Sequence, residues 1–244
     1  MEQWVVVTGG GSGIGRAVCL EMAGNYHLRV LAVGRRKAPL LETGRLAGGA
    51  VDICVADVAT PDGREKIAAQ MQGKKIRFVV HNAAVLEPVK PLSKVSLKEW
   101  QTHFAINVEG PLFLTQALLT QLQAGSRILH ISSGAAHHAY AGWGAYCSSK
   151  AALHMLYRVW NLELKDRGIR VGSVRPGVVD TPMQDRVRQA TPDTFPALDK
   201  FLKLKEEGKL LDPQTVARYI GRLLTATDDE TFSGQEWDIR EHRL

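Results

Sequence analysis

The sequence predicts an α/β fold in which a doubly wound, mostly parallel sheet forms a single domain. Short, nearly continuous apolar runs, such as residues 3–8 and 76–81, alternate with longer stretches at helical spacing, such as residues 14–24. Strands that are apolar on both faces are buried by helices on both sides, as in doubly wound parallel sheets. The 244 residues show no linker, internal repeat or shift in composition, so we expect one domain covering residues 1–244.

The expected elements follow in order along the chain. Strands are predicted at residues 3–8, 27–33, 51–56, 76–81, 127–132 and 169–174, and residues 232–240 close the chain. Helices are predicted at residues 14–24, 97–122, 146–166 and 212–224, the last opening on Asp212 and Pro213. Residues 180–211 form a long connection containing Pro182, Pro192, Pro196 and Gly208. Because connections of this length are often functional, we expect a lid over a substrate site.

Composition excludes several classes of protein. Hydrophobic residues make up 45% of the chain, which excludes a disordered protein. No run approaches the roughly 20 apolar residues that span a membrane, and the first residues lack the basic region of a signal peptide. Three cysteines make a disulfide framework improbable and favour a reducing, cytoplasmic location. The net charge is +6, but the lysines of residues 200–209 alternate with Glu206 and Glu207, so we expect no nucleic-acid partner.

A glycine-rich turn follows the first predicted strand and opens the first predicted helix. The run TGGGSGIG at 8–15 contains the candidate binding residues Gly9, Gly11, Ser12, Gly13, Ile14 and Gly15. Glycines let the backbone turn sharply beside a pyrophosphate, and the helix N-terminus offers free N–H groups. The spacing G-x-x-x-G-x-G differs from the G-x-G-x-x-G dinucleotide pattern, yet its place between strand and helix predicts a dinucleotide site.

The end of the second predicted strand indicates which dinucleotide binds. A site for NAD places an acid here to bond the ribose 2′-hydroxyl. This chain has Gly34, Arg35 and Arg36 instead. Because guanidinium groups bind phosphate bidentately, these residues favour NADP(H).

A tyrosine and a lysine at helical spacing form the candidate catalytic pair. Tyr146 and Lys150 are four residues apart, so on a helix they share a face. A neighbouring cation lowers the pKa of a phenol, which suits proton exchange with a carbonyl oxygen or an alcohol. Ser133 lies 13 residues before Tyr146 at the end of a predicted strand, and Asn107 lies within the preceding helix.

With these residues in place, the chain resembles the short-chain dehydrogenase/reductase family, which has the Rossmann fold, over nearly its full length. Besides TGGGSGIG, Asn107, Ser133, Tyr146 and Lys150, the resemblance rests on Asp57-Val58, HNAA at 81–84 and RPGVVDTPM at 175–183. In HNAA, His81 and Ala84 replace an asparagine and a glycine of the family pattern. Stretches such as AAVLEPVKPLS at 83–93 and GQEWDIREHRL at the end are similar to the benzil reductase branch, which is related to sepiapterin reductase.

The resemblance implies a role for each matching residue. Tyr146 is implied as the acid in reduction and the base in oxidation, and Lys150 as the group that bonds the nicotinamide ribose and lowers the Tyr146 pKa. Ser133 is implied to orient the substrate carbonyl, and Asn107 to hold a water that links Lys150 to solvent. The remaining implied cofactor contacts are Asp57, Val58, Asn82, Ala83, Ala84, Pro176, Gly177, Val179 and Thr181.

The implied activity is NADPH-dependent reduction of a small-molecule ketone or α-dicarbonyl compound. Two other functions stay open: a sepiapterin-type pterin reductase or alcohol-oxidising dehydrogenase, and a dinucleotide-sensing protein without turnover. Family members form dimers or tetramers through two long helices, which implies a homo-oligomer built on residues 97–122 and 146–166.

Apolar residues near the catalytic set are candidates for the substrate wall, and each is equally compatible with core packing. They are Leu86, Val89, Tyr140, Trp143, Met183 and Phe195. His137 and His138 invite a metal site, but no carboxylate or cysteine accompanies them at ligand spacing, so we expect none.

Overall fold

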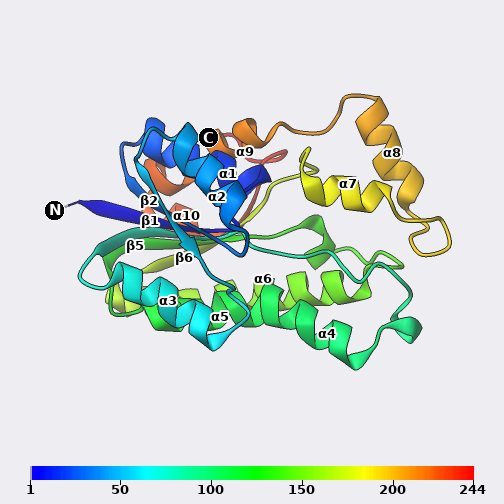
Figure 1. Cartoon of the computed structure of the whole chain (residues 1–244), viewed down its shortest axis with the longest axis horizontal. Coiled ribbons are helices and arrows are strands. Elements are labelled where there is room, and N and C mark those ends of the chain that lie inside the picture. The colour runs from blue at the N-terminus through cyan, green and yellow to red at the C-terminus, as the bar shows by residue number, and fades with distance from the viewer. Residues whose placement is uncertain (1) are drawn as a thin grey trace.

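The computed structural model describes residues 2–244, and in them a parallel sheet lies between two layers of helices (Figure 1). Its seven strands stand in the order β3-β2-β1-β4-β5-β6-β7, and all neighbouring pairs run parallel. The strands are β1 (Gln3–Thr8), β2 (Arg29–Gly34), β3 (Val51–Val55), β4 (Lys75–His81), β5 (Leu122–Ile131), β6 (Arg170–Arg175) and β7 (Glu236–Asp238). The chain starts in the middle of the sheet, builds outward to β3, and returns beside β1, which confirms the doubly wound fold.

Apolar side chains alternate between the two faces of each central strand. In β1, Val5 and Val7 belong to one buried cluster, whereas Trp4 and Val6 belong to the cluster on the opposite face. Successive side chains of a strand point to opposite faces, so a run without polar breaks supplies two cores at once.

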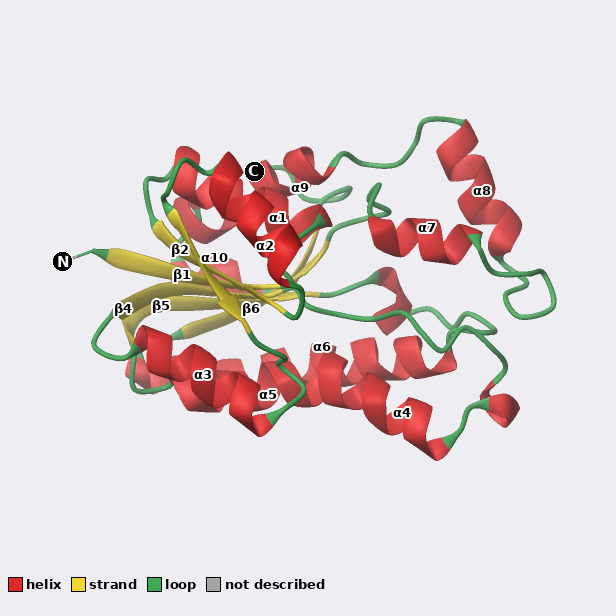
Figure 2. Ribbon diagram, viewed as in Figure 1, coloured by secondary structure: helices red, strands yellow, loops and turns green. Residues whose placement is uncertain are grey.

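Helices cover each of these faces (Figure 2). One layer contains α1 (Gly13–Gly24), α2 (Lys37–Leu46), α9 (Pro213–Ala226) and α10 (Asp229–Gly234). The other contains α3 (Pro61–Met71), α4 (Leu97–Phe104), α5 (Gly110–Leu118) and α6 (Gly144–Leu164). Helix α9 begins as predicted, because the Asp212 carboxylate accepts a hydrogen bond from Thr215 N at 3.2 Å.

Two further helices lie beyond the carboxyl ends of the strands. They are α7 (Pro182–Arg188) and α8 (Leu198–Glu206), both within the long connection at residues 180–211. This connection therefore has regular structure, and its Phe195 and Phe201 share a buried cluster with Leu86 and Trp143 from the rest of the fold.

Several predicted boundaries are wrong. The predicted helix at 97–122 is divided into α4, a π-turn (Ala105–Glu109) and α5, which ends at Leu118. Pro111 has no N–H to donate within a helix, so its hydrogen bond is lost and the helix changes geometry just before it. Strand β5 then begins at Leu122, where Leu122 pairs with Ile76, rather than at residue 127.

Five helices, namely α2, α3, α7, α8 and α10, were not predicted. Helix α2 contains Pro39 and Gly44, and α3 contains Gly63, residues that weaken a helical pattern in the sequence. Within residues 2–244, no helix has both the length and the apolar character to cross a membrane.

Candidate active site

A cavity of about 970 Å³ opens at the carboxyl edge of the sheet, where ligands bind in open α/β folds. Loops that follow β1 to β6 all contribute to its wall. Its volume lies at the upper end of the range of about 300–1,000 Å³ for small-molecule sites. Almost all predicted cofactor residues line it, namely Gly9, Gly11, Ser12, Gly13, Ile14, Gly34, Arg35, Arg36, Asp57, Val58, Asn82, Ala83, Ala84, Tyr146, Lys150, Pro176, Gly177, Val179 and Thr181.

The glycine-rich turn forms one end of this cavity. Gly9 and Gly13 have φ angles of +69° and +52°, in the left-handed region that side chains disfavour. Gly15 is different, because it is not among the lining residues. A Cβ at Gly15 would collide with the carbonyl oxygen of Gly9. The absence of a side chain at Gly15 therefore lets α1 start directly against the turn, and its predicted contact with the cofactor stays a prediction.

Thr8 and Asn82 hold the ends of β1 and β4 together beneath the turn. The N–H groups of Asn82 and Ala83 both donate to Thr8 Oγ1 at 3.0 Å. The Asn82 side chain donates from Nδ2 to the Thr8 carbonyl oxygen at 2.9 Å. These bonds fix the backbone of the HNAA segment where it borders the cavity.

The end of β2 makes one wall of the cavity cationic. Arg35 is 59% exposed in its side chain, and its Nη1 lies 4.0 Å from Asp57 Oδ2. Arg36 lines the same wall. Asp57 balances one of these two charges, so an excess of positive charge faces this part of the cavity.

Ser133, Tyr146 and Lys150 meet on another wall. Ser133 follows β5, and the other two lie one turn apart on α6. Tyr146 and Lys150 are 7% and 4% exposed. Lys150 Nζ donates to the Ile131 carbonyl oxygen at 2.7 Å and lies 5.6 Å from the centre of the Tyr146 ring. The structure thus brings together the three residues that the sequence singled out.

Burial controls the ionisation of this pair. It raises the pKa of Tyr146 to about 12, and the hydrogen bond with Ser133 opposes that increase. Burial also lowers the pKa of Lys150 to about 8. In the polypeptide itself, burial outweighs the effects that lower the pKa of the phenol, and the role of Lys150 in lowering it stays a prediction.

Asn107 lies behind this wall, in the π-turn, and does not line the cavity. Its Oδ1 accepts from Val85 N and its Nδ2 donates to the Val85 carbonyl oxygen, both at 2.9 Å. Nδ2 also lies 2.9 Å from His103 Nε2. These protein partners occupy the Asn107 side chain, and the water expected beside this residue stays a prediction.

His103 is a buried polar residue that sequence reasoning missed. It is 1% exposed, with Nδ1 2.7 Å from the Glu87 carbonyl oxygen and Nε2 2.9 Å from Ser149 Oγ. Nδ1 therefore carries the ring proton and Nε2 accepts, which orients the Asn107 amide. Its position four residues before Asn107 on a helix was the available signal.

The start and end of the 180–211 connection are joined beside the cavity. Val179 and Leu211 form an isolated parallel bridge, and Asp180 N donates to the Leu211 carbonyl oxygen at 2.9 Å. The 180–211 connection therefore leaves the fold and returns to it at one place, and the residues between its two ends can extend over the cavity.

Aromatic and apolar side chains form the wall beyond Tyr146. Leu86, Tyr140, Trp143 and Met183 line the cavity as predicted, whereas Val89 and Phe195 do not. Phe195 is fully buried and stacks on Trp143 from behind, with ring centres 4.4 Å apart. Phe201 of α8 takes the predicted place of Phe195 at the wall. The sequence pattern could not distinguish them, because both are aromatic residues in the same connection.

Comparisons with known proteins agree with this geometry. The profile of the family described as short chain dehydrogenase matches residues 3–192. Benzil reductase ((S)-benzoin forming) of Bacillus subtilis (strain 168) is 31% identical over 243 residues, covering 97% of this chain and 98% of the relative. Sepiapterin reductase of Mus musculus is 32% identical over 255 residues, covering 96% and 95%. The crystal structure of the KRED1-Pglu enzyme superposes with a TM-score of 0.87 at 30% identity, covering 96% and 99%.

Proposed function

The chain belongs to the short chain dehydrogenase family and is benzil-reductase-like, and from this premise we propose that it is an NADPH-dependent reductase of ketones and α-dicarbonyl compounds. The observation that carries the proposal is the shared wall of Ser133, Tyr146 and Lys150. With a pKa of about 12, Tyr146 keeps its proton at neutral pH. A protonated phenol can donate to a carbonyl oxygen, as the proposed reduction requires.

A dinucleotide held in this cavity would supply a hydride for the carbonyl carbon. Tyr146 donates its phenolic proton to the carbonyl oxygen, so the substrate would gain one hydride and one proton and become a secondary alcohol. Ser133 donates a hydrogen bond to the same oxygen and holds it beside Tyr146. Lys150 would bond the ribose of the dinucleotide and would add positive charge beside the phenol. Solvent would return the proton through the water expected beside Asn107.

The part of the cavity formed by the glycine-rich turn and the end of β2 fits a dinucleotide. The positive φ angles at Gly9 and Gly13 keep side chains out of the turn that would receive the pyrophosphate. Arg35 and Arg36 provide the positive charge for a 2′-phosphate, which supports NADP(H) rather than NAD(H).

The 180–211 connection is proposed as the lid over the substrate. Met183 and Val187 of α7 and Phe201 of α8 line the cavity, and the Phe201 ring centre lies 5.1 Å from that of Trp143. An aromatic and apolar wall suits a diketone with aromatic substituents, such as the substrate named for the benzil reductases.

A pterin substrate is less well supported. Across residues 2–244, the acidic residues that line the cavity are Asp57 and Glu87. Asp57 faces Arg35, and Glu87 lies 3.2 Å from Arg186 Nη1 at an exposed position. The resemblance to sepiapterin reductases implies an acidic residue in the C-terminal part of the chain that holds the pterin, and neither of these two residues lies there.

The decisive experiment measures NADPH oxidation by the purified protein with benzil as substrate. We expect turnover in the wild type and a decrease in kcat of at least about 100-fold in Tyr146→Phe, because the general acid is removed. NADPH affinity, measured by calorimetry, should stay within about threefold, since the phenol is not proposed to hold the phosphates.

Tyr157→Phe is the matched control, because Tyr157 is buried on the same helix and does not line the cavity. Undiminished activity in Tyr146→Phe would exclude this residue as the acid. Tight NADPH binding without turnover across a panel of carbonyl compounds would point instead to a dinucleotide sensor.

A further inference from the structure

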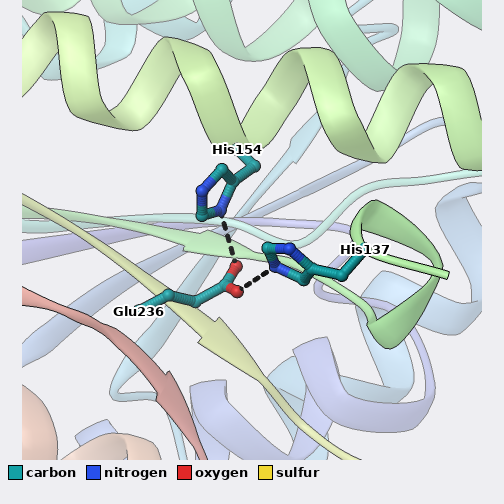
Figure 3. Close-up of side chains that lie close together, drawn as sticks. All are labelled: His137, His154 and Glu236. Atoms are coloured by element: carbon teal, nitrogen blue, oxygen red, sulfur yellow. Dashed lines mark hydrogen bonds and ion pairs between the residues drawn. The ribbon is translucent and has the colours of Figure 1, made fainter.

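Two histidines and a glutamate converge outside the cavity, where the edge strand of the sheet meets α6. His137 follows Ser133 by four residues, His154 follows Lys150 by one helical turn, and Glu236 is the first residue of β7. Figure 3 shows both imidazoles pointing at one carboxylate. His137 Nε2 lies 2.5 Å from Oε2, and His154 Nδ1 lies 3.1 Å from Oε1.

The donor atoms of the three side chains all lie within 4.8 Å of one another. In a tetrahedral zinc site, bond lengths near 2.1 Å place neighbouring ligand atoms about 3.4 Å apart. The distance of 3.1 Å between His154 Nδ1 and the carboxylate is close to this value, whereas the distance of 2.5 Å from His137 Nε2 must widen by about 0.9 Å to admit an ion. Two imidazole nitrogens and one carboxylate oxygen are also a donor set that zinc prefers.

Groups around the glutamate hold it in place for such a site. Ser173 Oγ donates to Glu236 Oε1 at 3.0 Å, and the Glu236 side chain is 8% exposed. Hydrogen bonds of this kind orient metal-binding carboxylates. Arg175 Nε lies 3.5 Å from Oε2, but Arg175 also faces Asp238 and Glu241, so its charge is shared among three carboxylates.

Access to the cluster comes from solvent. His137 and His154 are 36% and 21% exposed in their side chains. A metal requires His137 Nε2 and His154 Nδ1, the nitrogens that face the carboxylate, as electron-pair donors without a proton.

We propose that His137, His154 and Glu236 bind one Zn²⁺ ion per chain, with water in the fourth position. None of the three lines the cavity, so the ion takes no part in the proposed reduction. It joins β7 to α6 and to the segment after Ser133, and so supports the two elements that present Ser133 and Lys150. His137 was considered as a ligand from the sequence, but the carboxylate was missed because Glu236 is 99 residues from His137 and 82 from His154.

Cobalt titration of the chelator-treated, full-length protein tests the proposal. Co²⁺ in a site of this kind gives visible absorption bands that report on its geometry, and Zn²⁺ should displace it. We expect saturation at one equivalent. Zinc at about 100 times its dissociation constant should raise the unfolding midpoint by about 5–10 °C.

His137→Ala and His154→Ala should each abolish the cobalt bands and the thermal shift, whereas His138→Ala should keep both. His138 is the matched control, since it is adjacent to His137 but outside the cluster. Glu236→Gln should also abolish the cobalt bands and the thermal shift. If Glu236→Gln does not fold, His137→Ala still tests the proposal, because His137 is the more exposed of the two residues. Absence of saturable bands in the wild type, or their persistence in both histidine variants, would overturn the proposal.

Discussion

Arg35 is the residue on which the proposed choice of cofactor depends. Its guanidinium lies at the end of β2, is mostly exposed, and has Asp57 as a distant partner at 4.0 Å. An exposed ion pair at this distance is weak, so the guanidinium is free to turn toward a phosphate. Replacing it with an acid would both remove a donor and repel a 2′-phosphate.

We predict that Arg35→Asp raises the dissociation constant of NADPH by about 10–100-fold, the loss expected for a hydrogen bond to a charged group. The dissociation constant of NADH should change by less than about threefold. Fluorescence titration with both nucleotides measures this difference, and Arg45→Asp on α2 is the control because Arg45 lies outside the cavity. Equal weakening of both nucleotides would show that Arg35 does not read the 2′-phosphate.

Local spacing made some residues of the site predictable and left others hidden. Tyr146 and Lys150 share a helical face, so four residues of sequence were enough to pair them. His103 acts through tertiary contacts with the Glu87 backbone and Ser149, and no local pattern reports these. Phe201, and not the predicted Phe195, lines the cavity, because tertiary packing determines which way each of these aromatic side chains points.

At the scale of elements, α4, α5 and α6 present an apolar surface that the fold does not use. Met155, Val159 and Leu162 form a stripe on α6, at 52%, 41% and 71% exposure. Phe113 on α5 and Leu97 on α4 are also exposed. Large exposed apolar patches mark interaction sites, and a face that pairs with its own copy generates a symmetric dimer.

We predict that the protein forms a homo-oligomer through this surface, and that Val159→Glu lowers the mass measured by light scattering to that of a smaller species. A buried, unpaired carboxylate in each copy would destabilise the contact. Leu41→Glu should leave the mass unchanged, because Leu41 is 51% exposed on α2 in the other layer. A monomeric wild type at micromolar concentration would contradict the prediction.

At the scale of the whole molecule, stability should depend on pH through Lys150. Its pKa is about 8 in the folded chain and 10.5 when unperturbed, because burial disfavours the ammonium. Between these values the unfolded chain binds more protons than the folded chain, so stability rises with pH. Below about pH 8 the buried ammonium destabilises the fold by its full amount.

We predict that wild type gains stability relative to Lys150→Met as pH increases from 7 to 10, by about 2–3 kcal/mol. Urea unfolding of both proteins at several pH values measures the difference. Lys150→Met also leaves the Ile131 carbonyl without its hydrogen-bond donor, which lowers the free energy of unfolding by an amount that does not depend on pH. This constant amount cancels when the difference between the two proteins is compared across pH values. A difference that stays constant over this range would show that Lys150 is not perturbed.

The global architecture was easier to predict than its details. Apolar runs such as β1 determine a sheet buried on both faces, so the fold class followed from the sequence. The interruption of the helix at 97–122, the extent of β5 and the edge strand β7 depend on Pro111, on pairing with Ile76 and on contacts with β6. These contacts join distant segments, and a local pattern cannot contain them.

The order of the strands also determines when the sheet can be completed during synthesis. Neighbours in this sheet are far apart in the chain, and such non-local pairing slows folding. β1 lacks its partner β4 until residues 75–81 have emerged from the ribosome, and β6 keeps one unpaired edge until residues 236–238 emerge. A nascent chain therefore exposes an open strand edge late in translation, when a chaperone that covers such edges would protect it from aggregation.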